Sequence, residues 1–128
     1  MFERIRIIVG YDNSSQSRKG LEVAITIAKC FSGFIRVVNV YEKSKLKEAE
    51  ATIMIAEQNL QKEDVRHECI SVLGSNVGKV LVSMVKQENF ALIIVGSRGL
   101  GGGLSMLLGS VSKEVVSNAF CNVLVVKK

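Results

Sequence analysis

The sequence lacks several residue types on which specialised classes of protein depend. Its 128 residues include no proline and no tryptophan, and aromatic residues make up only 5% of the chain. No apolar run approaches the roughly 18 residues of a membrane-spanning helix, and the first residues form no apolar signal-peptide core. Few stacking side chains, with no basic cluster among them, argue against nucleic acid as a partner. We therefore expect a cytoplasmic protein that binds neither membranes nor nucleic acid.

Histidine and cysteine are also scarce, which argues against a metal centre. The chain has one histidine, His67, and three cysteines, Cys30, Cys69 and Cys121, with no Cys-x-x-Cys pair. An odd number of widely spaced cysteines does not suit a disulfide framework, and no cluster suits a zinc site. We expect reduced thiols packed against apolar neighbours, and a surface or structural role for His67.

Apolar residues are plentiful, at 48% of the chain against 23% charged residues. This is enough to bury a core, and the length suits one compact unit, so residues 1–128 are predicted to form a single domain. The formal net charge of +5 is compatible with an anionic ligand.

Short β-branched runs alternate with segments of helical periodicity along the chain. Five runs predict strands over 5–9, 35–40, 69–73, 92–95 and 123–126. The first and fourth are almost continuously apolar, as in central strands of a parallel sheet that is covered on both faces. The helical stripes are Leu21, Ala24, Ile25, Ala28 and Phe31, then Leu46, Ala49, Ile53, Ala56 and Leu60, then Val77, Val80, Leu81, Met84 and Val85, and last Val111, Val115 and Val116. This alternation predicts an α/β fold around a parallel sheet.

Glycine is concentrated after the fourth predicted strand. Five of the 11 glycines lie between Gly96 and Gly103, and Gly109 precedes the last predicted helix. Residues without Cβ atoms let peptide N–H groups approach a phosphate, and the N-terminus of a following helix favours an anion. The segment has neither the Gly-Lys-Ser/Thr of a P-loop nor a dinucleotide fingerprint. The residues alone leave open a phosphate-binding loop and an ordinary surface loop.

A second candidate site follows the first predicted strand, because ligands gather beyond the carboxyl ends of strands in open α/β sheets. Asp12 could accept hydrogen bonds from ribose hydroxyls or hold a metal-bound water. The run Asp12-Asn13-Ser14-Ser15 is also ordinary helix-capping chemistry, so the ligand and capping interpretations both stand.

Together these segments resemble the ATP-binding signature of the universal stress protein family. Gly96-x-x-Gly99, nine further residues and Gly109-Ser110 match that signature, and Val9-Gly10-Tyr11-Asp12 matches the close of the family's first strand. The resemblance spans the whole chain. It implies a three-layer α/β sandwich of the adenine nucleotide alpha hydrolase-like type, whose five-stranded parallel sheet has the strand order 3-2-1-4-5.

The resemblance also implies a ligand, which is an adenine nucleotide, ATP, with Mg²⁺ as a candidate companion ion. Asp12 would contact the ribose and Val40 would line the adenine pocket. The implied nucleotide-binding residues are Gly10, Tyr11, Asp12, Val40, Gly96, Arg98, Gly99, Gly109, Ser110 and Val111. Family members commonly pair their last strands, which implies a homodimer through Val123, Leu124, Val125 and Val126.

The function implied by the resemblance is that of a nucleotide-dependent sensor or regulator in stress response. No water-activating base or arginine-finger pair is visible, so hydrolysis should be slow or absent, and no catalytic residue is assigned. Two alternatives stand beside it: a slow ATPase or adenylyl-transfer enzyme, and an interaction module of the same fold that binds no nucleotide. The sequence names no regulatory protein partner.

Overall fold

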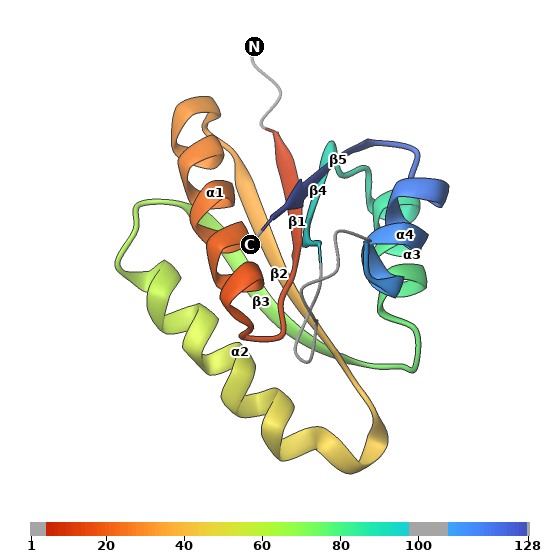
Figure 1. Ribbon diagram of the computed structural model, residues 1–128. Helices are drawn as coiled ribbons and strands as arrows, with labels where there is room; N and C mark the ends of the chain where they lie inside the picture. The colour runs from red at the N-terminus through yellow and green to blue at the C-terminus, as the bar shows by residue number, and fades with distance from the viewer. Residues whose placement is uncertain (1–4, 98–107, 128) are drawn as a thin grey trace.

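A computed structural model describes residues 5–97 and 108–127 of the chain. They form a five-stranded parallel sheet in the order β3-β2-β1-β4-β5 (Figure 1). In chain order the elements are β1 (Arg6–Gly10), α1 (Ser15–Phe31), β2 (Phe34–Tyr41), a short 3₁₀ helix η1 (Lys43–Lys45), α2 (Leu46–Gln61), β3 (Arg66–Leu73), α3 (Val77–Glu88), β4 (Leu92–Gly96), α4 (Ser110–Asn118) and β5 (Asn122–Val126). The α/β class and the strand order are those that the resemblance implies, so both expectations are confirmed.

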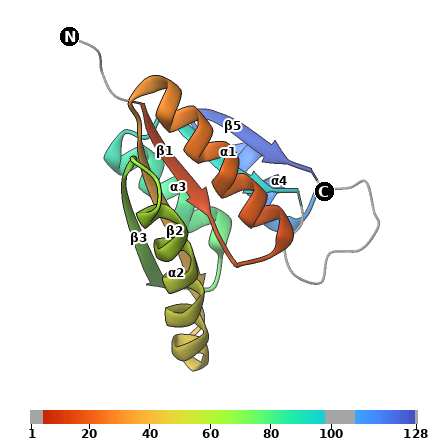
Figure 2. The ribbon, with the colours of Figure 1, turned by 90° about the vertical axis from the view of Figure 1, so that its left-hand side faces the viewer.

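The helices form one layer on each side of the sheet. α1 and α2 cover one face, and α3 and α4 cover the other (Figures 1 and 2). Successive side chains of β1 enter opposite cores: Ile7 and Val9 pack on the α1 side and Ile8 on the α3 side, and all three are fully buried. Burial on both faces explains why β1 and β4 are almost continuously apolar.

The helix ends follow from local capping chemistry. The hydroxyl of Ser14 caps α1, and the side-chain oxygen of Asn76 caps α3. α1 ends because Ser32 adopts a left-handed conformation with a φ of 53°. A Cβ on the next residue, Gly33, would lie 2.7 Å from a side-chain carbon of Ile5, so only glycine lets the chain enter β2 this close to β1.

Several expectations about individual side chains are wrong. The apolar stripes predict that Phe31, Leu46 and Val116 pack inward, but their exposed fractions are 65%, 47% and 50%. Phe31 is the last residue of α1 and Leu46 the first of α2, where a helix has no further turn to hold the side chain inward. On α4, Val115 takes the buried position and turns Val116 outward. Cys30, expected to be packed, is also exposed in the last turn of α1.

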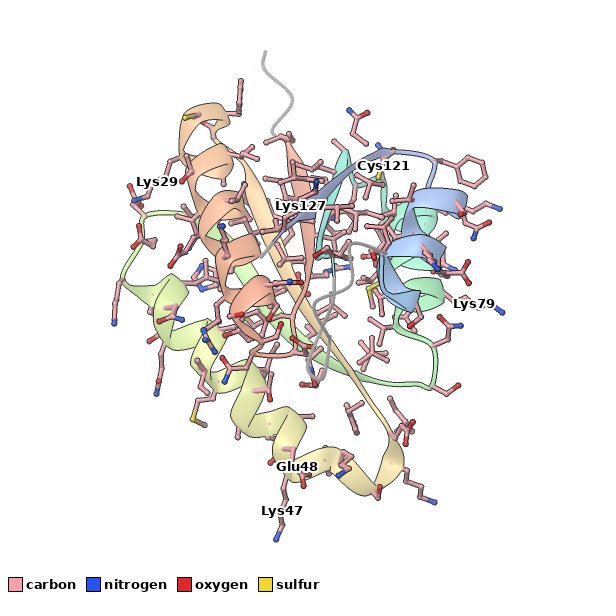
Figure 3. All side chains as sticks on the ribbon, in the orientation of Figure 1. Lys29, Lys47, Glu48, Lys79, Cys121 and Lys127 are labelled. Atoms are coloured by element: carbon pink, nitrogen blue, oxygen red, sulfur yellow. The ribbon has the colours of Figure 1, made fainter. Side chains whose placement is uncertain are left out.

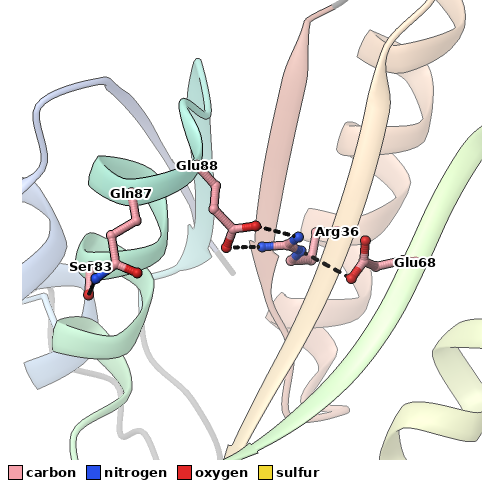
Figure 4. Close-up of polar contacts among 5 residues, drawn as sticks. All are labelled: Arg36, Glu68, Ser83, Gln87 and Glu88. Carbon is pink, nitrogen blue, oxygen red and sulfur yellow. Dashed lines mark hydrogen bonds and ion pairs between the residues drawn. The ribbon is translucent and has the colours of Figure 1, made fainter.

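An ion-pair cluster around the buried side chain of Arg36 joins α3 to the first halves of β2 and β3 (Figure 4). The Arg36 side chain is only 10% exposed and donates two hydrogen bonds to the carboxylate of Glu88, at 2.6 and 2.9 Å. Its Nε lies 3.4 Å from Glu68, the residue opposite it in the parallel register. These hydrogen bonds from Arg36 hold the pKa of Glu88 below its ordinary value. The cluster lies far from the carboxyl ends of the strands and therefore supports the fold.

α2 packs against β2 and β3, and the side chains of Lys47 and Glu48 in its first turn point outward (Figure 3). His67 of β3 joins the two elements: its Nε2 lies 3.3 Å from a carboxylate oxygen of Glu57 on α2. This contact agrees with the structural role expected for His67. None of the helices in the described ranges is long and apolar enough to cross a membrane.

Candidate functional site

The carboxyl ends of β1 and β4 mark the point at which the connections leave the sheet on opposite sides. β1 leads into α1 on one face, and the connection after β4 leads to α4 on the other (Figure 1). The two strands are direct neighbours, with Val9 beside Ile94. In open α/β sheets, a crevice for ligands forms at such a switch point.

A hollow with a cavity volume of about 100 Å³, partly open to solvent, lies at this point. Its walls come from the ends of β1, β2 and β4 and from the first turns of α1, α3 and α4. The lining residues are Gly10, Tyr11, Asp12, Ser14, Ser17, Val38, Asn39, Val40, Val77, Val95, Gly96 and Val111. Asp12 is the one charged residue among these, so the hollow combines apolar walls with a single carboxylate.

The turn between β1 and α1 is held by hydrogen bonds that fix Asp12. Oδ1 of Asp12 accepts the backbone N–H of Ser14 at 2.9 Å, which makes an Asx-type turn. The backbone N–H of Asp12 in turn donates to the hydroxyl of Ser17 at 3.3 Å. Both contacts lie within the capping structure of α1, so the capping interpretation of this run is confirmed. They also hold the carboxylate at the wall of the hollow.

Asn13 occupies the left-handed region of the backbone, with a φ of 63°, which asparagine tolerates better than most residues. The Tyr11 hydroxyl donates to its side-chain oxygen at 3.0 Å, and Arg18 donates to its carbonyl at 2.6 Å. The Tyr11 ring is buried, and this burial is the main cause of a raised pKa for its phenol. The phenol therefore remains a hydrogen-bond donor, and the turn has a fixed shape.

The end of β2 forms the second wall. The backbone N–H of Tyr11 donates to the carbonyl of Val38 at 2.9 Å, which extends the β1–β2 ladder beyond the last residue of β1. The buried side-chain amide of Asn39 donates to the carbonyl of Tyr11 at 2.9 Å. Val40 follows at the rim of the hollow. This wall presents apolar side chains and backbone groups, which suit a flat heterocycle.

α4 begins beside the hollow, and its own cap residue offers no side chain to its first amides. Its N-cap residue is Gly109, which has no side chain to accept hydrogen bonds, in contrast to the caps of α1 and α3. Val111 in the first turn lines the hollow, and Ser110 lines a neighbouring groove between α3 and α4. A helix N-terminus carries partial positive charge, so this wall suits an anionic group.

The structure brings six of the predicted nucleotide-binding residues to the hollow: Gly10, Tyr11, Asp12, Val40, Gly96 and Val111. Ser110 lies in the adjoining groove and Gly109 directly before α4. Arg98 and Gly99 lie outside the described residues. That these residues bind a nucleotide stays a prediction, but their convergence from distant parts of the chain is a feature of the fold.

Sequence reasoning missed several lining residues, of which Ser14, Ser17, Asn39 and Val77 are examples. For Ser14 and Ser17, the capping run after Asp12 was a signal in the sequence that could have located them at the site. Asn39 could have been singled out because it is a polar residue within an apolar strand. Its place at the hollow, however, depends on β2 lying beside β1. In the two described ranges, no group of three His, Cys, Asp or Glu side chains is placed to hold a metal ion.

Strand order and switch-point hollow together define an open α/β protein with a hollow between the ends of its first and fourth strands. The chain belongs to the universal stress protein family, whose family model matches residues 3–127. Among curated proteins it is similar to the universal stress protein YxiE of Bacillus subtilis, with 25% identity over 95% of this chain and 98% of that protein.

Solved structures of the family share the fold. A universal stress protein of Archaeoglobus fulgidus in complex with dAMP aligns with a TM-score of 0.79 and 19% identity, over 99% of this chain and all (100%) of that one. A universal stress protein family member of Arabidopsis thaliana with AMP bound aligns with a TM-score of 0.74 and 18% identity, over 97% of this chain and 92% of that one.

Proposed function

We propose that this protein binds an adenine nucleotide in the hollow between the ends of β1 and β4. The observation that carries the proposal is the convergence there of a carboxylate, an apolar wall and the start of α4, from three distant segments. A nucleotide needs these three environments in one place, for its ribose, its base and its phosphate.

Each part of the nucleotide has a matching wall. The adenine would lie against the apolar side formed by Val40 and Val111. Asp12 would accept hydrogen bonds from the ribose hydroxyls, since an ionised carboxylate accepts but does not donate. The phosphate would lie near Gly109 and Ser110, where the amides of α4 begin.

The ligands named for the two solved relatives support an adenine nucleotide. One of these relatives was solved with dAMP and the other with AMP. We propose ATP, with Mg²⁺ as a companion ion, as the ligand of this chain, with residues of the glycine segment such as Arg98 and Gly99 helping to hold the longer phosphate tail.

We propose a regulatory role in stress response, with slow or no hydrolysis. The one carboxylate among the described lining residues, Asp12, already accepts the N–H of Ser14 through Oδ1. A group so placed is suited to holding a ribose and poorly suited to taking a proton from water. Binding would connect the first turns of α1 and α4, and a partner could recognise the surface that results.

The test starts from the protein as it is purified. Heat denaturation should release an adenine nucleotide, which mass spectrometry identifies. Calorimetry with AMP, ADP and ATP, each with and without Mg²⁺, then ranks the ligands. Absence of both released and titratable adenylate would contradict the proposal and favour the interaction module, whereas steady release of ADP or AMP from ATP would favour the enzyme.

We also propose that the protein forms a homodimer through β5. β5 is an outer strand of the sheet, and its exposed edge is apolar at Val123, Leu124 and Val125. Two apolar side chains nearby are strongly exposed, Val116 at 50% and Phe120 at 81%. An apolar edge strand beside exposed apolar side chains favours pairing with a second copy.

A further inference from the structure

The residues on either side of 98–107 are joined by a buried hydrogen-bond cluster, which consists of Ser97, Gly109 and Ser112. The backbone N–H of Gly109 donates to the carbonyl of Ser97 at 2.7 Å. The hydroxyl of Ser112 lies 3.1 Å from that carbonyl and 3.1 Å from the carbonyl of Gly109. Ser112 is only 1% exposed. These hydrogen bonds therefore hold the end of β4 against the start of α4.

This cluster is anchored on two further sides. The backbone N–H of Ser97 donates to the carbonyl of Val126 at the end of β5, at 2.8 Å. The hydroxyl of Ser97 lies 3.3 Å from the side-chain oxygen of Gln16 on α1. The start of α4 is thus held relative to the sheet and to α1, which carry most of the other residues that line the hollow.

Ser112 itself lines neither the hollow nor the adjoining groove. Its hydroxyl acts on the carbonyls of Ser97 and Gly109, which flank the proposed phosphate position. Carbonyl oxygens carry partial negative charge and would repel a phosphate that they faced. The single hydroxyl hydrogen of Ser112 is shared between these two oxygens and adds to the backbone N–H groups of Gly109 and Lys113, which they also accept. Both oxygens are thereby held inward, and the first amides of α4 keep their place beside the hollow.

We propose that Ser112 is a positioning residue for the phosphate end of the ligand. The inference rests on the proposed nucleotide binding and deepens it: the affinity gained from the phosphate depends on a hydroxyl that does not touch the ligand. A substitution of Ser112 should therefore weaken the binding of nucleotides and leave the binding of adenosine unchanged, because adenosine lacks the phosphate that the start of α4 would bind.

The experiment compares two ligands in matched variants. NMR titrations of the isotope-labelled protein with AMP and with adenosine measure dissociation constants into the millimolar range. Ser112→Ala should raise the dissociation constant for AMP about five- to tenfold, the effect of losing about one hydrogen bond, and change that for adenosine less than about twofold. Ser112→Thr retains the hydroxyl and should bind AMP like the natural protein. Ser83→Ala, at an exposed serine of α3 that lines neither the hollow nor the groove, is the control.

The outcomes separate this inference from the proposed function. If the natural protein binds neither ligand, the proposed function fails and the role of Ser112 fails with it. If AMP binds and Ser112→Ala weakens both ligands equally, or weakens neither, the nucleotide site stands and the positioning role is wrong. A folded Ser112→Thr variant as weak as Ser112→Ala also overturns the role of the hydroxyl. Melting curves of each variant verify that it is folded.

Discussion

Asp12 offers a sharp test of the site, because capping and ligand binding predict different results for two substitutions. Oδ1 of Asp12 accepts the N–H of Ser14 at 2.9 Å, so part of the side chain is structural. The ribose contact needs the charge and the acceptors of an ionised carboxylate. Asp12→Asn keeps one oxygen that can accept from Ser14, but it removes the charge and replaces the other oxygen with a donor group. Asp12→Ala removes the charge and both acceptor oxygens.

The expected sizes of the effects on binding and stability follow from the hydrogen bonds that each substitution removes. A hydrogen bond to a charged group is worth about 1.5–3 kcal/mol, which corresponds to roughly a 10- to 150-fold change in the dissociation constant. Asp12→Asn should therefore weaken AMP binding about 10- to 100-fold and change the free energy of unfolding by less than about 0.5 kcal/mol. Asp12→Ala should weaken binding by a similar factor and also lower the free energy of unfolding by about 1 kcal/mol, because the N–H of Ser14 loses its acceptor.

Calorimetry measures the binding, and urea denaturation followed by circular dichroism measures the stability. The reasoning is refuted if Asp12→Asn binds AMP as tightly as the natural protein while Asp12→Ala alone is destabilised. Asp12 would then be only a capping residue, and the ribose would need another partner.

Three other predictions address the phosphate wall, the edge strand and the ion-pair cluster. Gly109→Val places bulk at the start of α4 and should abolish AMP binding in calorimetry, with an unchanged far-UV spectrum; undiminished affinity would exclude Gly109 from the site. Val125→Lys puts a charge on the β5 edge and should give monomers in light scattering, and a folded variant that remains dimeric contradicts the interface. Because Arg36 lowers the pKa of Glu88, this pair stabilises the protein above the ordinary carboxyl pKa and ceases to do so as the pH falls through the lowered value. Glu88→Gln should therefore cost about 1 kcal/mol or less at pH 7, given that the Glu88 side chain is 42% exposed, and should flatten the acid limb in urea titrations.

The fold was predictable because its local signals agree with one another. Continuous apolar runs mark β1 and β4, and helical spacing marks α1 and α3 between them. The boundaries of β3 were less visible: the sequence predicts a strand from residue 69, whereas β3 starts at Arg66. Its polar first residues are compatible with a strand because Glu68 lies opposite Arg36 on β2. Such pairing of charges depends on the register between neighbouring strands, which cannot be deduced from the sequence of one segment.

The sequence predicted those site residues whose position follows from the order of strands and helices along the chain. It predicted less well those that reach the hollow only through packing between distant segments. Asp12 follows the end of β1 and Gly96 ends the neighbouring strand β4, so the rule for switch points locates them from the order of strands and helices along the chain. Val77 reaches the hollow only because α3 packs closely on α4, where a Cβ on Gly78 would lie 2.7 Å from the side chain of Glu114. That distance is a result of tertiary packing and has no counterpart in the local sequence pattern.

The two helix starts at the hollow use serine in opposite ways, and this difference predicts the orientation of the ligand. On α1, the hydroxyl of Ser14 accepts a first-turn N–H, so the amide end of that helix is satisfied within the chain. On α4, the hydroxyl of Ser112 shares its hydrogen between two carbonyls, and the cap residue, Gly109, has no side chain to offer the first amides. A phosphate at α4 would face those amides, whereas a phosphate at α1 would approach the carboxylate of Asp12. At a separation of about 5 Å and an effective dielectric constant of about 20, two unit negative charges repel by roughly 3 kcal/mol. The ribose is therefore expected at α1 and the phosphate at α4, and the reverse orientation is disfavoured by roughly a hundredfold or more.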